Sequence, residues 1–179
     1  MAAWGRLLQP DLALGGSILK LTPELIARHR LKGLILDVDE TLVSFKQSQP
    51  IDEVCQWLEQ MQSRFIRVVL VSNNVSHSRI SRIADALGVE AFYIAAAKPS
   101  RRKLREAVAL MQLPHHEIAM VGDRLFTDVL GGNRLGLFTV LVEPMVDPVA
   151  ASSPKQCLRN TEIWISKRFG VILTGGDHG

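Results

Sequence analysis

Cysteines, aromatic residues and long apolar runs are all scarce in this sequence of 179 residues. The two cysteines, Cys55 and Cys157, lie far apart and have no ligand-like spacing, which argues against a disulfide framework or a cysteine metal site. We expect both to be buried free thiols in helical segments of a protein from a reducing compartment. No run approaches the roughly 18 apolar residues that a membrane-spanning helix requires. Internal repeats and low-complexity tracts are also absent, so a repeat or fibrous architecture is not expected.

The first 30 residues contain several apolar side chains, but Pro10, Asp11 and the pair Gly15 and Gly16 interrupt them. This arrangement differs from the three-part pattern of a secretory signal. It also lacks the clean apolar face of a helix that lies on a membrane. We therefore expect an arm that folds onto the domain, with a surface-lying segment as the alternative.

The overall composition is ordinary for a soluble globular protein, with 47% hydrophobic and 22% charged residues. The length suits one domain with a sizeable core. A formal net charge of +3 and a sequence pI near 9.1 give a mild basic bias. This bias favours phosphorylated partners or an anionic surface without proving either.

Apolar runs that read as strands alternate with segments of helical periodicity. We expect strands at 33–38, 66–71, 91–96, 118–121 and 137–142, and helices at 23–30, 50–64, 78–87, 100–112, 126–135 and 155–168. This alternation predicts an α/β, Rossmann-like three-layer fold with a central parallel sheet of about five strands. A single domain would comprise an N-terminal arm and helix (1–30), a catalytic core (31–143) and a C-terminal loop, helix and tail (144–179).

Polar side chains follow four of the five expected strands. The run GLILDVDETL, residues 33–42, ends its strand in Asp37, Asp39 and Thr41, and later strands end near Ser72, Lys98 and Asp123. Ligands of parallel α/β sheets bind outside the carboxyl ends of the strands, so these side chains are expected to meet there. Taken one at a time, each could be a solvated polar turn; their occurrence in series predicts a site.

The residue types in this series suit a divalent cation and a phosphoryl group. Asp37 and Asp123 can supply the oxygen ligands that Mg²⁺ prefers. Ser72 and neighbouring backbone N–H groups would hold phosphoryl oxygens, and Lys98 would oppose charge on the transferring group. A carboxylate can act as a covalent nucleophile, and a second acid can protonate the leaving oxygen and then activate water.

At these residues the chain resembles the haloacid dehalogenase superfamily of phosphatases. The four motifs of that superfamily are matched in order by DVDET (37–41), Ser72-Asn73, Lys98-Pro99 and GDRLFTD (122–128). The match covers residues 33–142 and implies a Mg²⁺ cofactor and a phosphorylated substrate. The resemblance implies that Asp37 is the nucleophile and Asp39 the general acid/base. It implies phosphoryl binding by Thr41, Ser72, Asn73 and Lys98. The implied metal ligands are Asp37, Asp123 and the main-chain carbonyl of Asp39, with Asp128 in the outer shell.

Only 30 residues separate Thr41 from Ser72 and only 25 separate Ser72 from Lys98. A helix and a strand fill most of each interval, so no cap domain is expected and the site should be open. An open site suits a bulky or surface-presented phosphate. The same motifs, with the PDL segment at Pro10, resemble the YqeG-like branch (class IIIA), which includes phosphatidylglycerophosphate phosphatases of mitochondria and plastids. The resemblance implies dephosphorylation of phosphatidylglycerophosphate to phosphatidylglycerol.

Two basic segments bear on such a lipid substrate. Four cations cluster after Lys98: Arg101, Arg102, Lys103 and Arg105. They form either a solvated face or a surface that attracts anionic lipid. The expected helix at 155–168 carries an apolar stripe flanked by basic residues, and packing on the sheet is favoured over lying on a membrane.

Other functions remain open at this stage. The same chemistry could act on a nucleotide, a sugar phosphate or a phosphoprotein. A ribosome- or RNA-associated binding module is an alternative of another class, although the intact carboxylates disfavour it and no nucleic acid is expected as a partner. A phospho-acceptor signalling domain would need its aspartate at a middle strand, where Ser72 and Lys98 stand. The expected location is cytoplasmic, or stromal or matrix in an organelle, with peripheral contact to an anionic membrane, and the oligomeric state is left unassigned.

Overall fold

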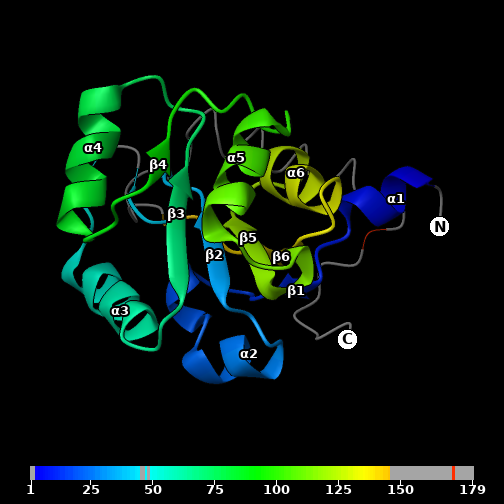
Figure 1. Ribbon diagram of the computed structural model, residues 1–179, viewed down its shortest axis with the longest axis horizontal. Helices are drawn as coiled ribbons and strands as arrows, with labels where there is room; N and C mark the ends of the chain where they lie inside the picture. The colour runs from blue at the N-terminus through cyan, green and yellow to red at the C-terminus, as the bar shows by residue number, and fades with distance from the viewer. Residues whose placement is uncertain (1–2, 45–46, 48, 146–170, 172–179) are drawn as a thin grey trace.

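The centre of the molecule is a six-stranded parallel sheet with the strand order β1-β6-β5-β2-β3-β4 (Figure 1). The computed structural model describes residues 3–44, 47, 49–145 and 171. Its strands are β1 (Leu12–Ala13), β2 (Gly33–Leu36), β3 (Arg67–Val71), β4 (Phe92–Tyr93), β5 (Ile118–Gly122) and β6 (Phe138–Leu141). The parallel α/β sheet predicted from the alternating pattern is thereby confirmed.

Helices cover both faces of this sheet, which gives three layers. The helices are α1 (Ala3–Leu8), α2 (Pro23–Arg28), α3 (Asp52–Gln62), α4 (His77–Ala86), α5 (Arg102–Met111) and α6 (Leu130–Asn133), with short 3₁₀ turns at Ile18–Lys20 and His115–Glu117 and a π-helical turn at Leu125–Val129. In Figure 1, α3 and α4 lie to the left of β3, and α5 and α6 lie to its right. No separate cap domain occurs within the described part of the chain.

The two-sided burial of β2 follows from its alternating side chains. Leu34 and Leu36 belong to the apolar cluster that includes α3 and α4, while Ile35 belongs to the cluster that includes α5. All four residues of this strand are buried. A strand covered on both faces is expected to be uninterrupted in its hydrophobicity, as this one is. The segment that follows β2 is therefore held by a strand that is buried along its whole length.

The N-terminal segment supplies β1, a sixth strand that the sequence pattern did not predict. It pairs with β6 at the sheet edge, with Leu12 opposite Val140. One oxygen of Asp11 accepts hydrogen bonds from the backbone N–H of Thr139 at 2.7 Å and from its hydroxyl at 2.9 Å. The Asn133 amide donates to two carbonyls of the same arm, at Leu7 and Gln9. A strand of two residues is too short to show a periodic sequence pattern, which is why it was not predicted. The polar contacts of Asp11 and Asn133 hold the arm against the sheet.

Several helix ends differ in detail from the expectation. Helix α2 begins at Pro23 as expected, and Thr22 caps it, since its hydroxyl accepts a bond from the N–H of Leu25 at 3.4 Å. Helix α5 begins two residues later than expected, at Arg102, with no side-chain cap. The segment expected to be one helix from 126 to 135 starts with the π-helical turn. Cys55 is a half-buried free thiol, less buried than expected. The predicted loop at 145–154, the helix at 155–168 and Cys157 lie outside the described residues, except Met145.

Candidate active site

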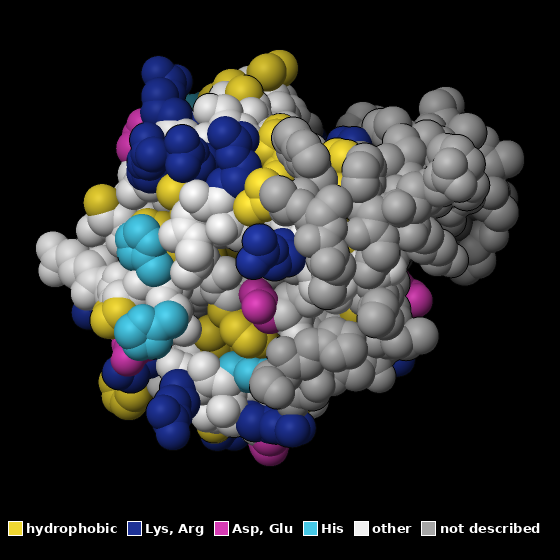
Figure 2. Space-filling view, turned by 90° about the vertical axis from the view of Figure 1, so that its right-hand side faces the viewer, with side chains coloured by type: hydrophobic (Ala, Val, Ile, Leu, Met, Phe, Trp, Pro, Cys, Tyr) yellow, Lys and Arg dark blue, Asp and Glu magenta, His cyan; other side chains and the backbone are white. Residues whose placement is uncertain are grey.

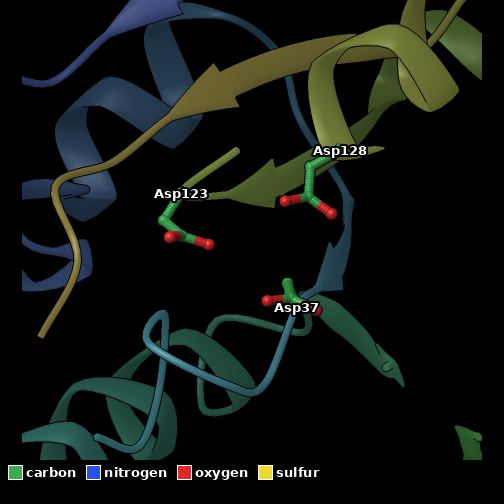
Figure 3. Close-up of side chains that lie close together, drawn as sticks. All are labelled: Asp37, Asp123 and Asp128. Atoms are coloured by element: carbon green, nitrogen blue, oxygen red, sulfur yellow. The ribbon is translucent and has the colours of Figure 1, made fainter. Parts of the chain in front are cut away.

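Three buried aspartates from separate elements meet at the carboxyl end of the sheet (Figure 3). Asp37 follows β2, Asp123 follows β5, and Asp128 lies in the π-helical turn. One carboxylate oxygen of each lies within 4.8 Å of the others. Figure 3 shows the three carboxyl groups facing a common space. The convergence expected for Asp37 and Asp123 is present, and Asp128 joins them.

Strand register places these residues side by side. Leu36 of β2 pairs with Val121 of β5, and the N–H of Asp37 donates to the carbonyl of Val121 at 2.9 Å. Gly122 then lets the third aspartate approach, because a Cβ there would lie only 2.4 Å from the carboxylate carbon of Asp128. Real Cβ atoms do not come so close, so the absent side chain is a requirement of this geometry.

Lys98 lies between two of the aspartates and is buried. Its ammonium contacts one oxygen of Asp37 at 2.5 Å and one oxygen of Asp128 at 2.7 Å. The Asn73 side chain holds the Lys98 backbone, since its oxygen accepts from the N–H at 2.7 Å and its amide donates to the carbonyl at 3.3 Å. The Lys98-Pro99 peptide bond is cis. Lys98 is thus fixed both at its backbone and at its charged end.

Burial controls the ionisation of this cluster. It raises the pKa of Asp37 to about 6; the Lys98 ammonium acts in the opposite direction, while the Asp128 carboxylate raises the pKa further. Burial alone would lower the pKa of Lys98, but the carboxylates of Asp128 and Asp37 outweigh it and raise the pKa above its usual range. At neutral pH, Asp37 is therefore a carboxylate and Lys98 an ammonium.

The charge of the cluster fits a divalent cation. Three carboxyl groups, those of Asp37, Asp123 and Asp128, lie together in a buried site, and the Lys98 ammonium contacts two of them. Buried acids gathered in this way are stabilised by a bound cation. The donors are all hard oxygens, which suit Mg²⁺ better than a soft metal. Asp37 and Asp123 can hold the ion. Lys98 contacts Asp37 at Oδ1, whereas both oxygens of Asp128 are engaged, Oδ1 by Lys98 and Oδ2 by the backbone N–H of Arg124 at 3.3 Å.

Two hydroxyl groups lie at the same end of the sheet. The Thr41 hydroxyl is buried and has no hydrogen-bond partner among the described residues. The Ser72 hydroxyl is also buried and accepts a bond from the N–H of Asn74 at 3.0 Å, which leaves its own proton available. Unsatisfied buried polar atoms are costly, so a ligand that pairs with them is expected. Phosphoryl binding by Thr41, Ser72 and Asn73 stays a prediction; the Asn73 side chain is engaged by the Lys98 backbone.

Asp39 is half-buried beside the cluster, and two residues not singled out from the sequence hold its carboxylate. The Arg79 guanidinium contacts one oxygen at 2.7 Å, and the Asn74 amide donates to the other at 3.1 Å. Arg79 is 40 residues away in the sequence, so no local spacing could have indicated this pair. Asp39 ligation of a metal through its main-chain carbonyl remains a prediction.

Comparison with known proteins agrees with this geometry. A model of the haloacid dehalogenase-like hydrolases matches residues 34–136. The protein named "Probable phosphatase YqeG" of Bacillus subtilis is 37% identical over 129 residues, which cover 72% of this chain and 74% of that protein. Phosphatidylglycerophosphate phosphatase 1 of Chlamydomonas reinhardtii chloroplasts is 31% identical over 155 residues, covering 78% of this chain and 55% of that protein. This chain therefore spans just over half the length of the algal relative.

Among solved structures, similarity is found to a deoxy-D-mannose-octulosonate 8-phosphate phosphatase of Haemophilus influenzae in its cobalt-bound form. The TM-score is 0.51 and the sequence identity 18%, with 63% of this chain and 68% of that chain covered. At this identity the likeness concerns the fold. It supports the assignment of the sheet and its crossovers.

Proposed function

This chain belongs to the haloacid dehalogenase-like hydrolase family and is one of its phosphatases, and we propose that it acts with Mg²⁺ through an aspartyl-phosphate on Asp37. The observation that carries this proposal is the buried Asp37 carboxylate, which contacts Lys98 and lies within reach of Asp123. A buried nucleophile beside a fixed cation is suited to attack on a phosphorus atom whose oxygens carry negative charge.

In the first step, an oxygen of Asp37 attacks the phosphorus of a phosphate monoester. The bond from phosphorus to the leaving oxygen breaks, and that oxygen takes the proton of the neutral Asp39 carboxyl group. The products are an alcohol, an aspartyl-phosphate and the Asp39 carboxylate. Lys98 opposes the charge of the transferring group, and the hydroxyls of Thr41 and Ser72 donate to its oxygens.

In the second step, the Asp39 carboxylate takes a proton from water, whose oxygen attacks the phosphorus. The bond from phosphorus to Asp37 breaks, so the Asp37 carboxylate and inorganic phosphate are released and Asp39 is again protonated. A Mg²⁺ ion held by Asp37 and Asp123, when bound, offsets the repulsion between the carboxylates and the phosphate. Asp128 keeps Lys98 in place throughout.

For the substrate we propose phosphatidylglycerophosphate, which would be converted to phosphatidylglycerol. Two relatives that bear this activity in their names, from Chlamydomonas reinhardtii and Arabidopsis thaliana, support the proposal. The described residues include no cap over the site, which leaves room for a head group attached to a bilayer. The connection from β2 to β3 contains only α3 as a helix among its described residues, and the connection from β3 to β4 contains only α4.

A basic surface near the site supports contact with an anionic bilayer. We define the arginine rim as Arg101, Arg102, Arg105 and Arg134, at and around the start of α5. Arg134 donates to the carbonyl of Pro99, next to Lys98, and Arg101 donates to the carbonyl of Arg134. Figure 2, which shows one side of the molecule, has Lys and Arg side chains gathered at its upper left, with hydrophobic side chains beside them. Lys103, expected in this cluster, is paired with Glu106 at 2.8 Å.

Apolar side chains at the same end of the sheet complement the arginines. Val75 is 77% exposed in the loop after β3, and Ala95 and Ala97 are exposed in the loop before Lys98. An apolar surface bordered by cations suits the boundary of an anionic membrane. No helix among the described residues is long and apolar enough to cross a bilayer. Peripheral attachment through the rim is accordingly the mode that we propose.

The proposed function is tested by phosphate release from a panel of substrates with and without Mg²⁺. The panel should contain phosphatidylglycerophosphate in vesicles, a sugar phosphate, a nucleotide and a phosphopeptide. We expect Mg²⁺-dependent release, with the highest kcat/KM on the phospholipid. A higher kcat/KM on one of the soluble phosphates would contradict phosphatidylglycerophosphate as the substrate but not the proposed phosphatase mechanism. Absence of release from every compound would contradict both.

A further inference from the structure

Both oxygens of the Asp39 carboxylate are held by donors that come from one other segment of the chain. Arg79 binds Oδ1 through its Nη1 at 2.7 Å, and Asn74 binds Oδ2 through its Nδ2 at 3.1 Å. We propose that Arg79 is the positioning residue of Asp39, with Asn74 marking the oxygen through which the proton moves. The inference rests on the proposed function, in which Asp39 is the acid and base.

The surroundings of Arg79 favour a fixed guanidinium. It lies in the first turn of α4, and only 15% of its side chain is exposed. Its second terminal nitrogen donates to the carbonyl of Gln47 at 3.0 Å. Because the guanidinium is planar and rigid, two contacts at different nitrogens fix its plane. Arg79 therefore joins α4, the Asp39 carboxylate and the carbonyl of Gln47 in one arrangement.

Asn74 is fixed in a different way. Its side-chain oxygen accepts from the N–H of Ser76 at 2.9 Å, and its own N–H donates to the Ser72 hydroxyl at 3.0 Å. The N–H of Ser76 thereby orients the side-chain amide of Asn74, and the backbone of Asn74 is held by Ser72, which is expected to bind the phosphoryl group. Its bond to Asp39 is between a neutral amide and a carboxylate, and is weaker than the Arg79 ion pair.

This difference assigns separate tasks to the two oxygens of Asp39. Oδ1 stays paired with the charged Arg79, while Oδ2 can exchange its amide partner for the leaving oxygen or for water. Proton transfer requires a heavy-atom distance of about 2.6–3.2 Å to the reacting group. Asp39 follows the end of β2, and the next residue, Glu40, has a φ of 67°. The Arg79 contact orients a carboxylate that this loop presents at the edge of the site.

The two chemical steps depend differently on a well-placed Asp39. An aryl phosphate has a leaving oxygen that departs without protonation, so its first step needs little help from an acid. An alkyl phosphate needs the proton in that step. The second step needs the base with either substrate, because water must lose a proton. Loss of the positioning residue should therefore slow alkyl phosphates more and make the aspartyl-phosphate accumulate with aryl phosphates.

The test compares Arg79→Gln with the wild-type enzyme on p-nitrophenyl phosphate and glycerol phosphate in the presence of Mg²⁺. We expect kcat on glycerol phosphate to fall roughly 100-fold, the scale of a misplaced catalytic group. The fall on p-nitrophenyl phosphate should be smaller, with a burst of about one nitrophenolate per active site before slow turnover. Arg79→Lys, which keeps the charge but not the fork, should recover part of the rate.

Two further variants separate positioning from a structural role. Arg82→Gln changes the same residue type less than one turn later on α4 and should behave as wild type. Arg82 is exposed, and its side chain donates to the carbonyl of Ser78, a residue of the same helix. Arg79→Gln added to Asp39→Asn should lower activity little beyond Asp39→Asn alone, since both changes remove one function. Equal losses on both substrates without a burst, or additive losses in the double variant, would overturn the inference.

Failure of the inference can be told from failure of the proposed function. If Asp37→Asn is inactive and the wild-type enzyme forms a phosphorylated intermediate, but Arg79→Gln matches wild type, only the positioning role is wrong. If the wild-type enzyme with Mg²⁺ releases phosphate from none of p-nitrophenyl phosphate, glycerol phosphate and the compounds of the substrate panel, the proposed function and the inference fall together.

Discussion

The ammonium of Lys98 lies 2.5 Å from an oxygen of Asp37, and both side chains are buried. The lysine is shared with Asp128, so a single cation neutralises part of two carboxylates. Removal of one partner from a buried ion pair leaves the other charge uncompensated, which is more destabilising than loss of an exposed pair. The same contact places a positive charge where a phosphoryl group would meet Asp37.

Replacement of Lys98 should therefore affect both stability and turnover. Lys98→Met keeps a similar volume but leaves Asp37 and Asp128 without their cation. In the absence of divalent ions we expect the free energy of unfolding to fall by about 3–5 kcal/mol. Phosphatase activity should be lost at the same time. Urea unfolding and phosphate release measure the two effects, and unchanged stability without Mg²⁺ would contradict the buried pair.

The Gly122→Ala variant tests the packing behind the aspartates. The new methyl group would collide with the carboxylate of Asp128 and displace it from Lys98. Overpacking of this kind costs about 1–3 kcal/mol, and we expect a fall in kcat of at least tenfold because Lys98 loses a partner. Gly131→Ala is a matched control, since its Cβ would meet a methyl group of Leu104 at 2.9 Å and lie at an ordinary contact distance of 3.8 Å from Pro99 Cα, with no carboxylate among its nearest atoms. That variant should lose stability but keep kcat; equal kcat values for both would contradict the account.

The raised pKa of Asp37 predicts a specific dependence of stability on pH. The ordinary value of 3.8 rises to about 6 in the folded protein because of burial, so the folded state binds this proton more tightly than the unfolded state. Without divalent ions, the stabilising contribution of the proton is present below pH 4 and is lost as pH rises through about 6. Asp37→Asn should remove this contribution.

Stabilisation by Mg²⁺ should increase with pH, in contrast to stabilisation by the proton, because the ion binds the Asp37 carboxylate and competes with the proton. The increase in Tm caused by Mg²⁺ should be larger at pH 7.5 than at pH 5, and should shrink in Asp37→Asn at both. Thermal unfolding with and without the ion measures this difference. An increase that is independent of pH would indicate that Mg²⁺ does not bind at Asp37.

The arginine rim predicts a surface effect that a soluble substrate does not show. Arg102 and Arg105 are exposed, and their replacement by glutamine should weaken binding to vesicles that contain phosphatidylglycerol, with kcat on p-nitrophenyl phosphate unchanged. A matched control replaces Arg30 and Arg64, which are exposed and precede β2 and β3 at the opposite end of the sheet. Vesicle sedimentation should separate the pairs; equal losses would contradict a role for the rim.

The main features of the fold could be predicted because they depend on local patterns. The apolar run before Asp37 indicates a buried strand, and parallel strands carry their end residues to one edge, which places Asp37, Lys98 and Asp123 together. The short strand β1 could not be predicted, since its two residues carry no period and the arm is held by contacts of Asp11 and of Asn133 at the end of α6.

The contacts around the site were harder to predict for a related reason. In the sequence, Arg79 has the position of a polar residue on the solvated face of a helix. Only the packing of α4 beside the end of β2 brings it to Asp39. The motif predicts that Asn73 contacts the phosphate, whereas in the structure its side chain is hydrogen-bonded to the backbone of Lys98. Side-chain partners across 25 to 40 residues depend on tertiary geometry, which residue spacing does not encode.

The most direct test of the central claim is to locate the phosphoryl group on the enzyme. The protein should be mixed with p-nitrophenyl phosphate and Mg²⁺, quenched in acid within the first turnover, digested and examined by mass spectrometry. The account predicts one phosphoryl group on the peptide that contains Asp37, and none in Asp37→Asn. Turnover without any phosphorylated enzyme, or a phosphoryl group that remains in Asp37→Asn, would contradict it.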